Sequence, residues 1–547
     1  MTEPIEFLWW KHGVIYQIYP RSFRDSSGNG IGDLQGIIEK LDYVAELGVD
    51  AIWVSPCYPS PMADFGYDVS DHCDIHPLFG TLQTMDALLQ AAHQRDLCVM
   101  LDFVPSHTSE QHQWFQESRA SRSNPKRDWY TWRDTGPDGG PPNNWLSIFG
   151  GPAWEWDAHT RQYYLHTYLK EQPDLNWRNP AVKEAMFSVV RFWLERGVDG
   201  FRVDAAHGFM KDPVLRDNPP NRNNAAIGYE SMDAYDSQLH VNDRGHPDIH
   251  AVYRELRALL DEYSRARPRF TVGEIHIFDW SKWASYYGAN LDEIHMPGNF
   301  TLVRIPWRAS LVRGKVDELE AALPAGAWPN HVLGNHDEHR IASRYGAAAA
   351  RTAAMLLLTL RGTPTLYYGD EIGMLNVTVP AEKCQDPWPQ RSGKPELSRD
   401  PQRSPMQWDA RPGAGFSGPA VHGDLPEPWL LFHPEYQRLN VATQRDEPGS
   451  MLDLYRCLLR LRRETPALTH GEYRALDDAP PAVYGYLREY GGDRLLVLLN
   501  FEGESKQVTS VSFDYGEVLL STTLDRDGAE GLDPMVLRPY EGVIIRV

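Results

Sequence analysis

Residues 200–207 read GFRVDAAH, and this short stretch decides the fold. Residues 200–203 form a β-prone run that ends at Asp204, so a carboxylate follows the strand directly. Gly197 comes just before the run and follows a helical stretch, as expected of a glycine that ends a helix in the left-handed conformation. This order of helix, glycine, strand and terminal acidic residue is typical of one unit of a parallel β/α fold.

The same order recurs between residues 14 and 372. Helical periodicity supports the segments between the strands, because Leu34, Ile37, Ile38 and Leu41 share one face, and Gly48 is suited to end that helix. The predicted strands are 14–19, 51–55, 98–104, 200–205, 270–275, 294–296, 331–333 and 365–368. Eight strands is the number in a closed (β/α)₈ TIM barrel, which is therefore the predicted fold.

Two long interruptions of the β/α pattern, and a change to short alternating runs near the C-terminus, divide the chain. Residues 106–177 are too long for a β/α loop and are predicted to form an inserted subdomain. The barrel then comprises residues 1–105 and 178–466, including an irregular, proline-rich segment at 374–449 that we expect to wrap over the barrel mouth. Residues 467–547 contain short alternating runs, at 483–487, 495–499, 508–513, 518–520 and 542–547, which predict a C-terminal antiparallel β-sandwich.

Charge and composition exclude several classes of protein. The net charge of −21 argues against a nucleic-acid partner, because such proteins need a basic surface. Five scattered cysteines predict neither a disulfide framework nor a zinc site and fit a reducing cytoplasm. The N-terminus lacks the pattern of a secretory signal, and the longest apolar stretch, 353–360, is too short to span a membrane. We therefore expect a soluble, cytoplasmic protein with a small-molecule substrate; its oligomeric state cannot be predicted.

Carboxylates lie at or just beyond the C-terminal ends of four predicted strands: Asp102, Asp204, Glu274 and Asp337. In β/α barrels, the C-terminal ends of the strands share one mouth, so these groups should converge. A single acidic residue after a strand usually only caps the next helix, but four of them indicate a site. One chemistry that fits is glycoside hydrolysis, in which a carboxylate nucleophile and a carboxylic acid flank the bond.

Other polar residues near these strand ends are expected to assist. His107, His336 and Arg202 would donate hydrogen bonds to sugar hydroxyls and to the nucleophile. Metal-dependent hydrolysis by Asp and His ligands is the competing use of such a cluster, but the strand ends contain no HExxH pair. We expect no cofactor for catalysis.

In these residues, the chain resembles glycoside hydrolase family 13, the α-amylase family. The segments that carry the resemblance are DFVPSH (102–107), GFRVDAAH (200–207), GEIH (273–276) and NHD (335–337), in the family's order, and QPDLN (172–176) is similar to the marker of its oligo-1,6-glucosidase and α-glucosidase branch. The resemblance implies that Asp204 is the nucleophile, Glu274 the acid/base and Asp337 a third carboxylate that holds the sugar. It also implies a retaining mechanism through a covalent glucosyl-enzyme.

The same resemblance implies an exo-acting enzyme. Asp64 and Tyr67 match residues that bind the terminal glucose in exo-acting relatives, and Arg403 matches the arginine that faces Asp64. A carboxylate and a guanidinium closing one end of the pocket would favour release of glucose from the non-reducing end of short α-glucosides.

The loop DSSGNGIGD (25–33) resembles the family's first-loop calcium site and the opening of an EF-hand loop. The ligands of a structural Ca²⁺ or Mg²⁺ would be Asp25, Ser27, Asn29, Ile31 and Asp33. The alternative is a glycine-rich turn that caps the next helix.

Two other functions are compatible with the same residues. A catalytically inactive relative that binds carbohydrate or associates with a transporter would lack a carboxylate or carry an anchor, and this chain retains all three carboxylates. Transglucosylation, or the interconversion of sucrose or trehalose, would use the same covalent intermediate, although the Arg-Leu-Asp-Arg-Phe signature of isomerising relatives is absent. Ala205, after the nucleophile, leaves the preferred linkage open.

Overall fold

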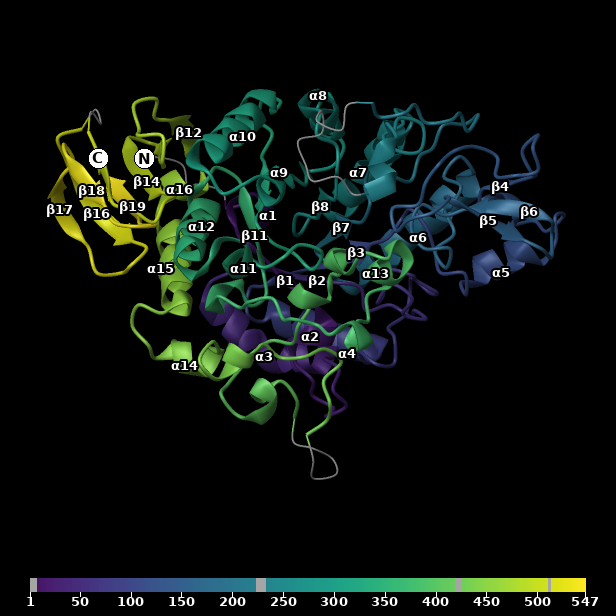
Figure 1. The fold of residues 1–547 in the computed structure, drawn as a ribbon, viewed down its shortest axis with the longest axis horizontal. Helices are drawn as coiled ribbons and strands as arrows, with labels where there is room; N and C mark the ends of the chain where they lie inside the picture. Colours follow the sequence, from purple (N-terminus) through teal and green to yellow (C-terminus); the bar gives the residue numbers. More distant parts are fainter. Residues whose placement is uncertain (1–6, 223–232, 419–424, 510–512) are drawn as a thin grey trace.

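The protein is described from a computed structural model that covers residues 7–222, 233–418, 425–509 and 513–547. Its centre is a (β/α)₈ barrel, flanked at one end by a small inserted sheet and at the other by a C-terminal β-structure (Figure 1). None of the described helices is both long and apolar enough to cross a membrane.

Eight parallel strands form the barrel in the order β10-β11-β1-β2-β3-β7-β8-β9. They are β1 Ile15–Ile18, β2 Ala51–Val54, β3 Cys98–Phe103, β7 Gly200–Val203, β8 Phe270–Gly273, β9 Met296–Pro297, β10 Asn330–Val332 and β11 Thr363–Tyr367. The predicted fold is confirmed, and each predicted strand has a counterpart within a few residues. β9 is only two residues long and forms no ladder with β10 in the described structure, so the barrel is nearly closed.

The helices pack around this barrel because one face of each is apolar. The main ones are α3 Leu34–Leu47, α4 Leu82–His93, α6 Pro180–Arg196, α7 Ile249–Tyr263, α10 Ala309–Ala322, α12 Ala347–Thr359 and α15 Met451–Glu464. In α3, Leu34, Ile37 and Leu41 are fully buried. Gly48 and Gly197 end α3 and α6 with φ of 95° and 104°, a conformation that an L side chain disfavours.

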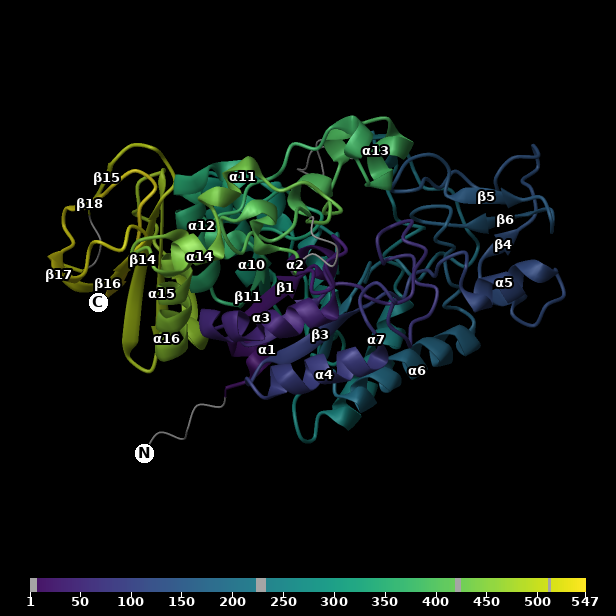
Figure 2. The same ribbon diagram turned by 90° about the horizontal axis from the view of Figure 1, so that it is seen from below.

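The residues between β3 and α6 form a separate small sheet. It contains β4 Trp132–Arg133, β5 Trp154–Asp157 and β6 Gln162–Leu165, and it is preceded by α5 Gln113–Ala120. The segment after β11 is irregular, with short helices that include α13 Pro387–Ser392, η8 Asp400–Gln402 and α14 Val441–Arg445. Figure 2 shows α13 on the side of the barrel from which the inserted sheet projects, and Trp388 of α13 contacts Phe149 of the insertion at 5.2 Å between ring centroids.

The C-terminal part is antiparallel, as predicted. It consists of a six-stranded sheet, β12-β13-β14-β19-β16-β17, and a two-stranded sheet, β15-β18. The strands are β12 Glu472–Ala475, β13 Val483–Tyr490, β14 Asp493–Asn500, β15 Lys506–Val508, β16 Tyr515–Ser521, β17 Gly528–Gly531, β18 Met535–Leu537 and β19 Gly542–Arg546. Part of the predicted strand 508–513 lies outside the described residues.

Candidate active site

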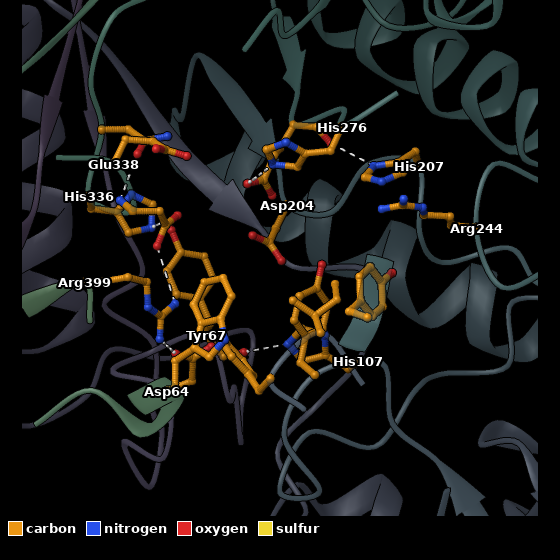
Figure 3. Close-up of a pocket in the computed structure, with 18 of the residues that line it drawn as sticks. Asp64, Tyr67, His107, Asp204, His207, Arg244, His276, His336, Glu338 and Arg399 are labelled. Carbon is orange, nitrogen blue, oxygen red and sulfur yellow. Dashed lines mark hydrogen bonds and ion pairs between the residues drawn. The ribbon is translucent and has the colours of Figure 1, made fainter. Parts of the chain in front are cut away.

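The polar residues that follow the barrel strands meet in one pocket at the C-terminal mouth. Asp102 lies in β3, Asp204 follows β7, Glu274 follows β8, and Asp337 follows β10. Asp204, Glu274 and Asp337 line a cavity of about 170 Å³, and Figure 3 shows Asp204 near its centre. The convergence expected from the strand order is therefore present in the structure.

A single buried guanidinium links three of the carboxylates. Arg202 is 3% exposed, and its Nη1 lies 2.7 Å from Oδ1 of Asp102 and 2.5 Å from Oδ1 of Asp204. Its Nη2 lies 3.0 Å from Oε2 of Glu274. The second carboxylate oxygen of Asp102 accepts a hydrogen bond from the Trp53 indole at 2.6 Å. Arg202 does not line the cavity, so its role is to hold carboxylates rather than to contact sugar hydroxyls.

The backbone that follows Asp204 also donates hydrogen bonds to Glu274. Ala205 has a φ of 45°, which is unfavourable for a residue with a side chain. This conformation lets the Ala205 N–H donate to Oε2 of Glu274 at 2.9 Å, while the Ala206 N–H donates to the Glu274 carbonyl at 2.9 Å. His276 Nε2 lies 3.3 Å from the other carboxylate oxygen of Glu274. Both oxygens of Glu274 are thus held in place.

Asp204 and Glu274 are close enough to compete for one proton. Burial, together with the neighbouring Glu274 and Asp102 carboxylates, raises the pKa of Asp204 well above its ordinary value, although Arg202 opposes this shift. Burial also acts to raise the pKa of Glu274, but Arg202, His276 and the Ala205 N–H hold it well below its ordinary value. The two carboxyls therefore form a coupled pair, and these opposite shifts favour a shared proton on Asp204 over Glu274.

Asp337 is held by groups that keep it ionised. Its Oδ1 lies 2.8 Å from Nη2 of Arg403 and its Oδ2 lies 3.1 Å from Nε2 of His336. Burial lowers the pKa of His336 to about 3, so this ring is neutral at neutral pH. Because Nδ1 of His336 faces the Gln17 amide nitrogen at 2.8 Å, Nδ1 accepts and Nε2 carries the proton. These contacts outweigh burial and lower the pKa of Asp337.

The prediction that Arg403 faces Asp64 is wrong, because Arg399 takes that place. Nη2 of Arg399 lies 2.7 Å from Oδ1 of Asp64 and 2.8 Å from Oδ1 of Asp386. The short helix η8 turns the chain between the two arginines. Arg403 consequently lies beneath Asp337, 1% exposed and outside the cavity lining, whereas Arg399 lines the cavity.

The Asp64 end of the pocket is closed by several elements. Gln172, from the QPDLN segment, lies 3.2 Å from Oδ2 of Asp64 and 3.1 Å from Nε2 of His107 through its amide nitrogen. Tyr67 stacks on His336 with ring centroids 5.4 Å apart and an interplanar angle of 2°. Asp64, Tyr67, His107 and His336 all line the cavity, so the structure brings these four predicted residues together.

Several lining residues were not predicted from the sequence. His207 and His276 lie just past strand ends, where the alternation of a strand no longer predicts the direction of a side chain. Others come from segments without periodicity: Ile148, Phe149, Tyr168, Tyr235, Asp236, Arg244, Phe278, Arg304, Glu338, Trp388 and Arg399. His207 and His276 lie in the quoted motifs GFRVDAAH and GEIH, and Gln172, which contacts Asp64 from outside the cavity lining, lies in QPDLN.

The loop 25–33 closes on itself around its two aspartates. Both oxygens of Asp25 accept backbone hydrogen bonds, from Gly28 at 2.7 Å and Gly30 at 2.8 Å, and Asp33 caps α3 by accepting from Gly36. Asp25 is fully buried and Asp33 is 5% exposed, and neither makes an ion pair with a described residue. No three His, Cys, Asp or Glu side chains in the described chain form a metal-ligating group.

The chain is similar to known proteins over most of its length. A family model described as "Alpha amylase, catalytic domain" matches residues 17–471. A probable alpha-glucosidase of Rhizobium meliloti (strain 1021) is 43% identical over 515 residues, which cover 91% of this chain and 90% of that protein. An oligo-1,6-glucosidase of Parageobacillus thermoglucosidasius is 36% identical over 583 residues, covering 99% of this chain and all of that protein.

Solved structures agree with these relatives. The alpha-glucosyl transfer enzyme XgtA superposes with a TM-score of 0.93 at 41% identity, covering 99% of this chain and 100% of that one. The trehalulose synthase MutB from Pseudomonas mesoacidophila MX-45 gives a TM-score of 0.88 at 35% identity, with coverages of 99% and 100%. The resemblance found in the sequence is therefore confirmed, and the chain belongs to the alpha-amylase family of glycoside hydrolases, family 13.

Proposed function

We propose that this protein is an exo-acting, retaining α-glucosidase that releases glucose from the non-reducing end of short α-glucosides. The observation that carries the proposal is the placement of Asp204 and Glu274 on one guanidinium, inside a pocket whose far end is closed by the Asp64–Arg399 ion pair. Relatives named alpha-glucosidase and oligo-1,6-glucosidase support the same class of substrate.

In the proposed reaction, the carboxylate of Asp204 attacks C1 of the terminal glucose. The bond from C1 to the leaving oxygen breaks while Glu274 gives that oxygen its proton. Water then attacks C1 of the covalent glucosyl-enzyme, passing a proton back to Glu274 and releasing Asp204 as a carboxylate. Glucose binding must therefore place the proton of the pair on Glu274, and Arg202 stabilises the anion that remains on Asp204.

Asp337 and its partners suit the binding of sugar hydroxyls. Its carboxylate stays ionised beside Arg403 and His336, so it accepts hydrogen bonds from two neighbouring hydroxyl groups of the ring. The flat face of Tyr67, fixed by its stack on His336, provides an apolar surface for the sugar.

The closed end accounts for exo action. Arg399 is shared by Asp64 and Asp386, and Gln172 supports Asp64 from the inserted segment. A sugar that extended past this end would have to break a buried ion pair, which is strongly unfavourable. The terminal glucose is thus the only unit that fits on this side of the bond to be cleaved.

Glucosyl transfer is a second candidate function of the same site. The covalent intermediate reacts with any hydroxyl group that reaches C1, and the structurally similar XgtA is named as a glucosyl transfer enzyme. We propose hydrolysis as the main reaction, with transfer to sugar hydroxyls at high sugar concentration.

We further propose a structural Ca²⁺ or Mg²⁺ in the loop 25–33. Asp25 and Asp33 are close enough for the charge of Asp25 to raise the pKa of Asp33, after the larger effect of burial. Two nearly buried carboxylates without a cationic partner favour a hard cation, and the other ligands would be oxygens of Ser27, Asn29 and Ile31. No step of the reaction uses this ion.

We expect replacement of Asp204 by Asn to lower kcat/KM for maltose by about 10⁴-fold, because the amide cannot form the covalent intermediate. The matched control is Asp86→Asn on the outer helix α4, which should leave turnover unchanged. NMR of the wild-type reaction should show α-glucose before mutarotation. Initial release of β-glucose, or undiminished turnover by Asp204→Asn, would exclude the proposed mechanism.

The pH dependence of kcat/KM should be bell-shaped. The rate should fall in acid only below the ordinary carboxylate range, where Glu274, with its lowered pKa, takes up a second proton. It should fall in alkali well above that range, where the pair loses its single proton, because burial raises the pKa of Asp204. With α-glucosyl fluoride, whose leaving group needs no acid, Glu274→Gln should lose the alkaline limb. Its persistence in that variant would assign the limb to another group.

Exo action can be read from the first products. Maltotetraose labelled at its reducing end should yield unlabelled glucose and labelled maltotriose at early times. Asp64→Asn should lower kcat/KM for this substrate by about 10- to 100-fold, since the amide weakens the hydrogen bonds at the closed end. Labelled maltose or labelled glucose as the first product would show internal cleavage or attack from the other end.

The metal site is tested by thermal unfolding. Ca²⁺ at one hundred times its Kd should raise the free energy of unfolding by about 2.7 kcal/mol over the chelated protein, and Asp33→Asn should lose most of this response. Equal midpoints with Ca²⁺ and with a chelator would show that the loop is stabilised by its own hydrogen bonds alone.

A further inference from the structure

Arg244 lies in the active-site pocket, on the segment between β7 and α7. It lines the cavity together with His207, Tyr235 and Asp236, and Figure 3 shows its guanidinium beside His207, directed towards the interior. Its guanidinium carbon lies 5.5 Å from the centroid of the Tyr235 ring. Neither the predicted catalytic residues nor the closed end of the pocket involves this arginine.

The other arginines in and below the pocket have their charges met by carboxylates. Arg202 and Arg399 each contact three carboxylates, Arg403 contacts Asp337, and Arg304 pairs with Glu338. Arg244, in contrast, makes no ion pair and no side-chain hydrogen bond with any residue in the described ranges. Its neighbour in sequence, Asp243, is bonded to His240 at 2.7 Å.

The charge of Arg244 persists despite its surroundings. Burial acts to lower its pKa, but Tyr235, Asp243 and Asp236 raise it overall. Arg244 is partly exposed in the wall of the pocket, and no residue in the described ranges accepts a hydrogen bond from its guanidinium. Its N–H groups are therefore available to a molecule that enters the pocket.

The position of Arg244 in the pocket determines which part of a bound substrate its guanidinium contacts. Asp64 and Arg399 close one end of the pocket, and Asp204 lies between that end and Arg244 (Figure 3). If the terminal glucose occupies the Asp64 end, the leaving group lies beyond Glu274, next to His207, His276 and Arg244. This step rests on the proposed function.

We propose that Arg244 determines specificity for the leaving group, by donating two hydrogen bonds to neighbouring oxygens such as the vicinal hydroxyls of a second sugar. The planar fork of a guanidinium matches two adjacent acceptors. A carboxylate would offer the same pair of oxygens, but the negative charge that the Asp204–Glu274 pair retains would repel an anion. The ligand is therefore a neutral sugar, bound at its diol.

The test compares three α-glucosides in the wild-type protein and in Arg244→Met. Maltose has vicinal hydroxyls on its leaving sugar, cyclohexyl α-glucoside has a ring without them, and α-glucosyl fluoride has no ring there. The readout is the ratio of kcat/KM for maltose to that for cyclohexyl α-glucoside, so that a general loss of activity cancels. We expect the variant to lower this ratio by about 10- to 100-fold, and Arg244→Lys to recover part of it.

Two controls separate the possible failures. Arg216→Met removes one positive charge from a largely exposed position on the same segment and should leave the ratio unchanged. An unchanged ratio in Arg244→Met, with α-glucosyl fluoride still hydrolysed, would overturn the role of Arg244 alone. A wild-type protein that cannot hydrolyse α-glucosyl fluoride would instead overturn the proposed function. A higher kcat/KM for a 4-carboxycyclohexyl α-glucoside than for maltose would overturn the proposal that Arg244 binds a neutral diol.

Discussion

The active site depends on one buried cation. Arg202, in the middle of β7, neutralises carboxylates from β3, from β7 itself and from the end of β8, within 2.5 to 3.0 Å. Three carboxylates could not remain buried together without it, because isolated charges in the interior are costly and like charges raise one another's pKa. The parallel register of these strands is what makes a single guanidinium sufficient, since it brings their polar ends to one level. The grouping of carboxylates at the barrel mouth is thus a consequence of the parallel strand register.

A second set of contacts ties the irregular segment after β11 to the same mouth. Arg403 supports Asp337 from beneath, and Arg399 closes the pocket at Asp64. Asp386 holds Arg399 with two oxygens, so the arginine is positioned before any sugar arrives. Preorganised groups of this kind contribute more to binding and catalysis than groups that must reorganise. The segment without regular structure therefore places two arginines at the site through ion pairs.

Whether a site residue could be predicted from the sequence depends on the kind of segment in which it lies. Asp204 and Glu274 were predicted as site residues because each lies at the end of a short apolar run, where a barrel strand reaches the mouth; their roles came from the family resemblance. The assignment of Arg403 to Asp64 was wrong, because the arginine that reaches Asp64 depends on a single 3₁₀ turn in a segment with no periodicity. His207 and His276 lie just past the strand ends, where the direction of a side chain depends on tertiary contacts such as the left-handed Ala205. Family resemblance identified the site, but the hydrogen-bond partners required the structure.

The two ends of the pocket differ in their ion pairs and in the parts of the chain that form them. At the Asp64 end, Arg399 pairs with Asp64 and Asp386, and the Gln172 amide contacts Asp64. A substitution there therefore disturbs contacts between three parts of the chain. At the opposite end, Tyr235, Asp236 and Arg244 all come from one connection between β7 and α7. Loops that follow barrel strands can change without altering the strands themselves. In the proposed function, the half that binds glucose is constrained by its ion pairs, whereas the half that receives the leaving group or an acceptor depends mainly on one loop. Proteins named as a glucosidase and as a glucosyl transfer enzyme are both similar to this chain.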